Sequence, residues 1–168
     1  SVGSGTTFQF SSTAAQTLSG LLSGSGALTK DTGTSNTLSI SGSGNTFSGA
    51  ITIGAGVLQL SGSGVLASGS YSNTISIATS SEFEHSSSAN QLLSGIISGA
   101  GVVFKDTSSS STLTLQAANT YSGGTTVSAG TLQANANSTP TSGTITSGPF
   151  GTNTVTVQSG GAVDFNGK

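Results

Sequence analysis

The sequence predicts an all-β protein, a parallel β-helix (solenoid) of about seven or eight coils, and three observations support this prediction. Short strands with alternating apolar and polar residues recur along the chain. Glycine, serine and asparagine separate these strands every few residues. A block of roughly 75–80 residues then occurs twice. No stretch keeps the 3.6-residue hydrophobic period of a helix, so strands are the main expected element.

Four segments show the two-residue period most clearly: NTLSI, NTISI, STLTL and NTVTV, which begin at Asn36, Asn73, Ser111 and Asn153. In the first of them Leu38 and Ile40 are expected on one face and Thr37 and Ser39 on the other. Further strands are expected at Ile51 (ITI), Val57 (VLQL), Val102 (VVF), Thr125 (TTV) and Thr144 (TITS). The corners between strands are expected to need a positive φ, which glycine and asparagine adopt most readily.

The internal repeat distinguishes a solenoid from other all-β folds. The segments that begin at Phe8 and Phe83 align at an offset of 75 residues, and the segments at Asn45 and Asn119 align at an offset of 74. We place the two units at about 8–82 and 83–162, with a third beginning at 163–168, in one β-helical segment that spans 1–168. A solenoid coil buries its apolar face only against the next coil. A sequence block that is repeated in register therefore favours a solenoid over a sandwich. Neither end of the chain coincides with an obvious cap, and we expect a window from a longer repetitive polypeptide or a unit of a head-to-tail assembly.

The composition excludes several classes of function. Only 5% of the residues are charged and the formal net charge is −2, so three lysines cannot form the basic surface that nucleic acid requires. The chain has no cysteine and therefore no disulfide or thiolate metal site. No apolar run approaches the length of a membrane-spanning helix, so we expect no membrane insertion by this segment.

One stretch stands out within each unit. NTYSGGTTVSAGTLQAN runs from Asn119 to Asn135, and a degenerate copy runs from Asn45 to Leu60. The copies share corner residues and aliphatic positions without a reactive group between them. We assign the structural motif to Asn45, Phe47, Gly49, Ile53, Gly56 and Leu58, and to Asn119, Tyr121, Gly123, Gly124, Val127, Gly130 and Leu132.

This stretch resembles the autotransporter-associated β-strand repeat, a motif of bacterial autotransporter passenger domains. The segment from Ser23 to Gly42 is similar to the one that usually precedes that motif, and GGAVDFNGK at the end is similar to the strand that often follows it. The resemblance implies a parallel β-helix that is extracellular or at the bacterial cell surface, and often part of an adhesin.

The best candidate for a chemical site is the cluster of Glu82, Glu84 and His85. Two carboxylates and an imidazole could bind a cation, but strand alternation places the two glutamates on one face and Phe83 with His85 on the other. We therefore favour a solvated strand edge, with His85 in the position that Phe10 and Phe165 fill in the other copies. No catalytic residue, metal site or cofactor is expected, and the chain is not expected to be an enzyme.

A Lys-Asp pair recurs at the same place in both units, as Lys30-Asp31 and Lys105-Asp106. Its functional interpretation is an isopeptide cross-link or a ligand contact. The interpretation that we favour is an exposed charged turn, in which the lysine discourages edge pairing and the aspartate closes an Asx-turn.

Three other patterns have simpler explanations. The SGSG runs at Ser41 and Ser61 are expected to be turns, because neither a nucleophile elbow nor a phosphate loop surrounds them. Asn137-Ser138-Thr139 is a glycosylation sequon that carries little weight. The outward Thr-x-Thr strands resemble an ice-binding ladder, but their spacing is irregular.

The sequence thus predicts a non-enzymatic structural segment, a stalk, spacer or filament unit that self-associates with further repeats along the helix axis and can stack end to end. The alternative is an adhesin module for a host or surface glycan or protein, for which only Tyr71 and Tyr121 offer tyrosine platforms. An ice-binding or polysaccharide-processing β-helix is a remote alternative.

Overall fold

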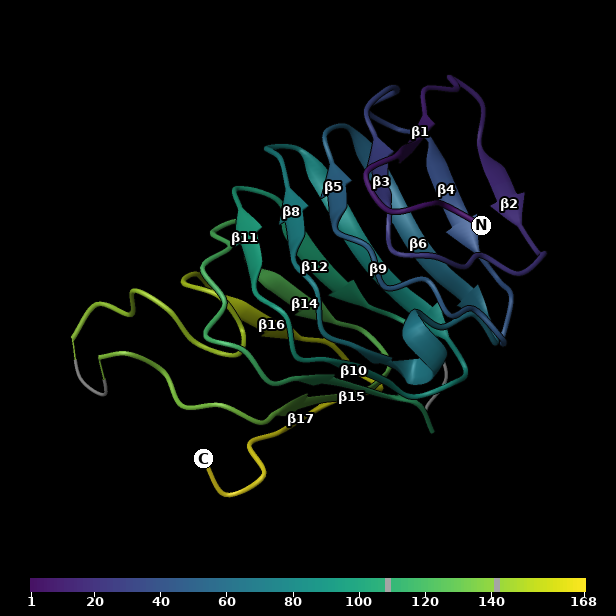
Figure 1. Ribbon diagram of the computed structural model, residues 1–168. Helices are drawn as coiled ribbons and strands as arrows, with labels where there is room; N and C mark the ends of the chain where they lie inside the picture. The colour runs from purple at the N-terminus through teal and green to yellow at the C-terminus, as the bar shows by residue number, and fades with distance from the viewer. Residues whose placement is uncertain (108–109, 141–142) are drawn as a thin grey trace.

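The chain folds into a parallel β-solenoid of about six turns, which confirms the predicted fold class. The computed structural model describes residues 1–107, 110–140 and 143–168. All pairs of named strands are parallel, and three sheets form the three sides of the coil. The two termini lie at opposite ends of the stack of turns (Figure 1).

Three sheets share the seventeen strands of the described chain. Sheet 1 contains β1 (Thr7–Phe10), β3 (Ala27–Lys30), β5 (Ile51–Ile53), β8 (Ile75–Ile77) and β11 (Ile97–Gly99). Sheet 2 contains β2 (Gln16–Leu18), β4 (Thr37–Ile40), β6 (Gly56–Gly62), β9 (Ser81–Ser87), β12 (Val102–Lys105), β14 (Thr125–Val127) and β16 (Val155–Val157). Sheet 3 contains β7 (Ser70–Tyr71), β10 (Gln91–Leu93), β13 (Thr112–Leu115), β15 (Gly130–Ala134) and β17 (Gly161–Asp164).

Helical structure is confined to one short 3₁₀ turn, Ala67–Gly69, among the described residues. Within the described ranges there is accordingly no helix with the length and apolar character needed to cross a bilayer.

The core is a set of aliphatic and aromatic columns that run along the solenoid axis. Leu38, Leu58, Phe83 and Val103 are partners on successive strands of sheet 2, and all four are fully buried. Their sequence neighbours face outward, as the two-residue period requires. Each turn therefore buries its apolar side chains against the turns before and after it, which is the packing that the internal repeat predicted.

The count of about six turns is slightly lower than the predicted seven or eight coils, and a longer last turn accounts for part of the difference. Most partners in sheet 2 are close to one coil length apart, as with Gln16 and Leu38. Thr125, however, pairs with Val155, 30 residues further along the chain. The intervening chain, 136–140 and 143–152, projects beyond the sheets (Figure 1).

The predicted strand at Thr144 lies in this projection and does not form. Its described neighbourhood contains two isolated antiparallel bridges, between Thr139 and Ser147 and between Asn119 and Gly148. The segment leaves the stack of turns and contacts the preceding turn again at Gly148, so its alternating residues do not extend a parallel sheet.

The sequence repeat and the structural turn have different lengths. From Lys30, three turns of sheet 1 lead through Ile53 and Ile77 to Gly99, whereas the repeat partner Lys105 lies on β12 of sheet 2. The same change of side relates β4 to β13 and β6 to β15. One repeat unit thus advances by about three and one-third turns, so equivalent residues lie on neighbouring sides of the solenoid and do not stack.

Candidate functional site

Each copy of the motif has one buried asparagine at the same corner, Asn45 in the first copy and Asn119 in the second. The side-chain Oδ1 of Asn45 accepts a hydrogen bond from the backbone N–H of Leu22 at 2.7 Å. The Oδ1 of Asn119 accepts the equivalent bond from Ile97, also at 2.7 Å. Both asparagines are fully buried, and each side-chain NH₂ donates to a backbone carbonyl, of Gly42 and of Pro149 respectively. Each amide therefore replaces ladder bonds at a place where the chain turns away from the sheet.

This role differs from the one expected for asparagine at the corners. Asn45 and Asn119 do not have a positive φ; in the described part of the chain the non-glycine residues that do are Ala67, Ser68, Ser80 and Asn166. The motif asparagines act through their side-chain amides: each Oδ1 accepts from the preceding turn, and the NH₂ of Asn45 donates within its own turn, to Gly42.

The aromatic position of the motif is also internal. Phe47 and Tyr121 are both fully buried, and the hydroxyl of Tyr121 lies 2.6 Å from Thr125 Oγ1. In the first copy the two equivalent positions are both apolar, since Phe47 replaces the tyrosine and Ile51 replaces the threonine. The two substitutions together remove a polar group and its partner, so neither copy leaves a buried hydroxyl unpaired at this place.

The motif glycines serve two different purposes. Gly56, Gly124 and Gly130 have φ values of 71°, 96° and 73°, as the sequence predicted for corners. Gly49 and Gly123 do not have a positive φ; a Cβ there would lie 1.6 Å from the carbonyl oxygen of Gly26 and 2.3 Å from that of Gly101. These two positions need glycine because the backbone of the preceding turn touches them.

The remaining motif residues are core. Ile53, Leu58, Val127 and Leu132 are fully buried in strands of sheets 1, 2 and 3. All the motif side chains thus contribute to packing or to internal hydrogen bonds, and none of them presents a reactive group at the surface.

Lys30 is not part of an exposed turn, and that prediction is wrong. Its side chain is fully buried, and Nζ donates to the carbonyl oxygens of Thr32 and Ala55 and to Asn36 Oδ1, at 2.7–2.9 Å. Burial lowers the pKa of Lys30, with the charge of Asp31 opposing this shift. The three protons of the ammonium each have an oxygen acceptor, so the group cross-links two turns and is not available to a ligand.

Lys105 has a similar arrangement on sheet 2, the side of the solenoid that follows sheet 1. It is fully buried and donates from Nζ to the carbonyl of Thr107, and burial lowers its pKa. Asp31 is exposed and accepts from Ser11, Gln9 and Thr32, and these bonds, that of Ser11 most, lower the pKa of its carboxyl. The recurring Lys-Asp pair therefore divides into an internal cation and an external carboxylate.

The cluster of Glu82, Glu84 and His85 does not assemble into one site. The two glutamates are half-buried on the outer face of β9, whereas His85 is fully buried on the inner face. Within the described residues no three His, Asp or Glu side chains are placed to hold a metal ion.

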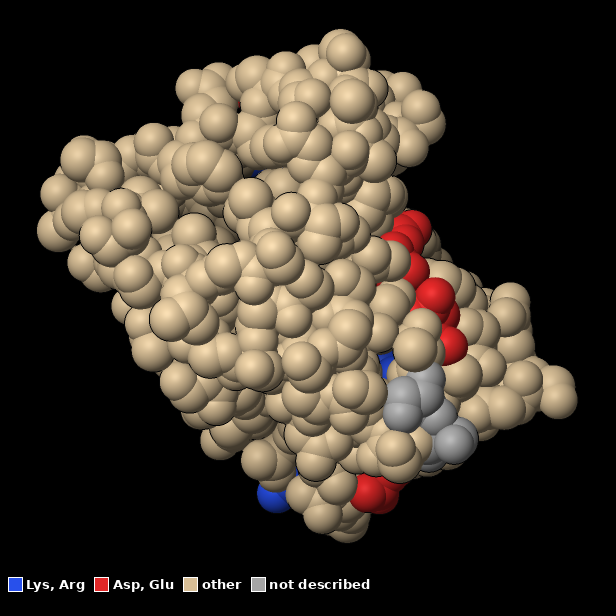
Figure 2. All heavy atoms as spheres, turned by 90° about the vertical axis from the view of Figure 1, so that its right-hand side faces the viewer, with Lys and Arg blue, Asp and Glu red and all other residues tan. Residues whose placement is uncertain are grey.

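Sequence reasoning missed the third member of the acidic group. Asp106 follows β12, the neighbour of β9, and the hydroxyl of Ser86 lies within hydrogen-bonding reach of Asp106 and of Glu84. Burial is the main cause that raises the pKa of Glu84 and of Glu82, and nearby carboxylates add to it. Most of the acidic atoms on the face that Figure 2 shows gather in one band, with a separate acidic patch near the bottom, and the rest of this face is largely uncharged. Strand pairing could have shown this group, because the register places β12 beside β9.

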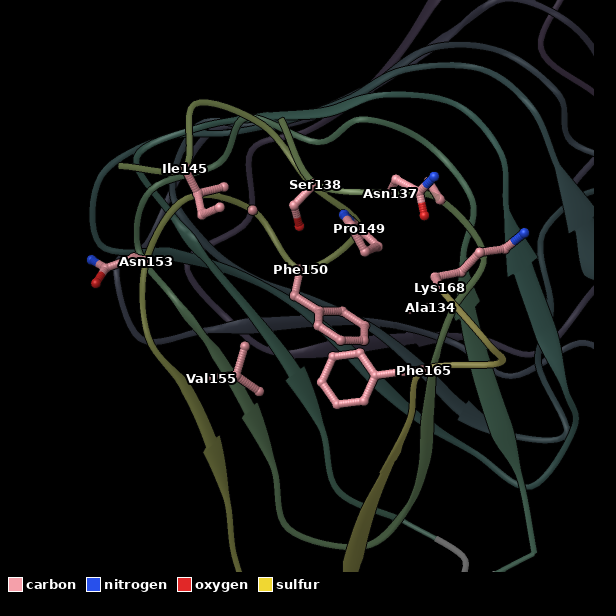
Figure 3. A pocket seen from close by; sticks show the side chains of 12 residues that line it. Ala134, Asn137, Ser138, Ile145, Pro149, Phe150, Asn153, Val155, Phe165 and Lys168 are labelled. Carbon is pink, nitrogen blue, oxygen red and sulfur yellow. The ribbon is translucent and has the colours of Figure 1, made fainter. Parts of the chain in front are cut away.

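A hollow of about 390 Å³ lies at the C-terminal end of the solenoid. The rings of Phe150 and Phe165 meet edge to face, with 5.9 Å between their centroids, and Val155 and Ile145 lie near them (Figure 3). Asn137 and Ser138, two residues of the sequon, also line it. The hollow is mainly apolar and holds no acid–base pair.

The tyrosines do not provide the platforms that an adhesin would use. Tyr71 and Tyr121 are both fully buried, and the hydroxyl of Tyr71 donates to the carbonyl of Gly49 at 2.6 Å. The hydroxyl of Tyr71 thus connects two turns from within, whereas that of Tyr121 bonds within its own turn, to Thr125.

Comparison with known proteins identifies the motif. A family model, the passenger-associated-transport-repeat, matches residues 32–60 and 108–134, which confirms the resemblance seen in the sequence. The first match contains β4, β5 and most of β6, and the second contains β13, β14 and β15. β4 pairs with β6, and β13 pairs with β15, so each copy spans one complete turn. Neither the curated proteins nor the solved structures gave a match.

The chain therefore carries two copies of this repeat on a β-solenoid, and both features fit a β-helical segment of an autotransporter passenger.

Burial of two of the three lysines has a direct chemical consequence. When the folded protein is treated with an amine-acetylating reagent, we expect Lys168 to react and Lys30 and Lys105 to be protected, by at least about tenfold, because a fully buried, hydrogen-bonded ammonium cannot reach the reagent. Peptide mass spectrometry would measure the three rates, with the denatured chain as the control. Equal rates in the folded protein would contradict the internal placement.

Proposed function

We propose that this chain is a non-enzymatic β-helical spacer in a bacterial cell-surface or secreted protein of the autotransporter type. The observation that carries the proposal is that each family match spans one whole turn, and that the motif side chains in it lie inside the solenoid. A unit of this kind adds length to a rod without adding a reactive or binding group.

The physical properties of the chain suit such a role. Hydrogen bonds between turns run along the axis in three parallel sheets, so the rod resists bending in every direction. The chain has no cysteine, and its passage in an unfolded form would not depend on the redox state of the compartment that it crosses. Once outside, burial of the internal columns would drive turn-by-turn folding.

A surface-display experiment tests the spacer function. One or two copies of the 168 residues would be placed between an outer-membrane anchor and an epitope, and the height of the epitope above the membrane would be measured by electron microscopy. A stiff solenoid predicts that the contribution of the insert doubles, with roughly 30 Å for each copy of about six turns.

A Gly/Ser linker of the same length is the matched control, because the dimension of a flexible chain grows only about 1.4-fold when its length doubles. The same 1.4-fold growth for the natural segment would overturn the spacer proposal.

We further propose that units of this protein associate head to tail along the axis. β2 and β16 end sheet 2, and β17 ends sheet 3, so the strand edges at both ends lack a partner among the described residues. Three of the four large hydrophobic side chains exposed in the described structure lie at the two end turns: Leu21, which is 73% exposed, Val157 and Phe165. A second copy in the same direction would offer a parallel edge to sheet 2, which among the described residues has strands in both end turns, β2 and β16.

Two variants, each blocked at one end, test this association. Leu21→Lys and Phe165→Lys should each be monomeric, while an equimolar mixture should form a 1:1 dimer through the two intact ends, as measured by analytical ultracentrifugation. Ile96→Lys is the control, since Ile96 is exposed between β10 and β11, away from both ends, and this variant should associate like the parent. A mixture that remains monomeric would contradict the head-to-tail interface and leave the spacer function untouched.

A further inference from the structure

The inner position of β9 holds a titratable ring where the first repeat has a phenyl ring. Phe10 pairs in register with Lys30, and Lys30 Nζ lies 5.7 Å from the centroid of the Phe10 ring. His85 pairs in register with Lys105 in the same way, one repeat later. The first arrangement is a favourable contact between a cation and an aromatic ring. The second arrangement would place two positive charges next to each other if the imidazole were protonated, so it is free of charge repulsion only while the ring is uncharged.

The surroundings of His85 provide little to compensate a positive charge. His85 is fully buried, and neither ring nitrogen has a hydrogen-bond partner among the described residues. On one side β6 presents Leu60, and on the other β12 presents Lys105, followed by Asp106. The carboxylates of β9 itself, Glu82 and Glu84, lie on the opposite face of the strand.

We propose that His85 makes the middle turns of the solenoid sensitive to acid, because its protonation would place a second buried cation next to Lys105 and weaken the pairing of β9 with β12. The neighbouring turns, which carry Leu60 and Val127 in the same inner column, contain no such group in that column. Acid would therefore act first at the β9–β12 junction, and the end turns would follow.

The direction of the pH dependence follows from the two states of the histidine. Burial is the main cause that lowers the pKa of His85 from 6.5 to about 4, and the charge of Lys105 adds to it, while the backbone at His85 and Ala89 and the charge of Asp106 oppose the shift in part. The unfolded chain takes up this proton near pH 6.5 and the folded chain only near pH 4, so the contribution is complete above pH 6.5 and is lost as the pH falls towards 4. Between pH 7.5 and pH 5.0 this single group should increase the unfolding equilibrium constant by about 30-fold.

The two glutamates on the outer face of β9 have the opposite effect on how stability changes with pH. The raised pKa values of Glu82 and Glu84 mean that the folded chain binds their protons more readily than the unfolded chain does. Acidification should therefore stabilise the fold through these two residues while it destabilises the fold through His85. Removing the histidine should reveal the contribution of the glutamates.

The variant His85→Phe tests the proposal, because it restores the residue that the first repeat has at this position. Urea unfolding of the parent and of the variant would be compared at pH 7.5 and pH 5.0. We expect the ratio of their unfolding constants to rise by about 30-fold at the lower pH, with the variant itself becoming more stable on acidification. A ratio that does not change with pH would overturn the proposal, since a purely steric role of the ring would give this result.

A second measurement does not depend on the folding of a variant. The chain has one histidine, so its ring protons give a single set of NMR signals that report one titration. A midpoint near pH 4, together with faster amide exchange in β9 and β12 than in β4 and β6 as the pH falls, would support the proposal. A midpoint near 6.5, or exchange that accelerates uniformly over all strands, would contradict it.

Discussion

The close approach of successive turns is the constraint on which the rest of this structure depends. Parallel strands stack about 4.8 Å apart, and at the corners the backbones come nearer still. Added Cβ atoms at Gly49, Gly95 and Gly123 would lie 1.6–2.3 Å from carbonyl oxygens of the preceding turn. The glycine content of the chain is thus the condition for continuous ladders, and the ladders give the rod its stiffness. Repeating this contact between turns lengthens the rod and leaves few reactive side chains on its surface.

The same constraint explains why polar side chains lie inside. Where the chain leaves a sheet at a corner, buried backbone groups lose their ladder partners and must find others. Asn45 and Asn119 provide amide groups for this purpose, and Lys30 provides a three-proton donor for oxygens of two turns. The internal cations and amides hold the corners in place, while the apolar columns supply most of the burial. Charge is therefore used structurally in a chain that has very little of it.

Sequence patterns predicted the fold because a solenoid repeats its own interface. The alternation in the strand at Leu38 and the copy of Asn45 at Asn119 were sufficient to predict stacked coils. The number of turns was not read from the alternation, and the local sign of the projecting residues 136–140 and 143–152 is that both prolines of the chain, Pro140 and Pro149, lie there. For Lys30, alternation from the buried Leu28 already indicated the inner face, but the expectation that charge is exposed prevailed. Asp106 was recognised only as part of the Lys-Asp pair, because its proximity to Glu84 arises across strands and pairing between strands is not visible in a linear pattern.

Thermal unfolding of two alanine variants at equivalent repeat positions tests the central constraint most directly. Gly20 and Gly95 align between the units, yet a Cβ at Gly95 would lie 1.9 Å from the carbonyl oxygen of Asn73, whereas a Cβ at Gly20 would meet nothing within 4 Å. Close approach of the turns predicts that Gly95→Ala destabilises the protein by about 1–3 kcal/mol, as overpacking does, while Gly20→Ala leaves the midpoint nearly unchanged. Equal midpoints for the two variants would contradict the account.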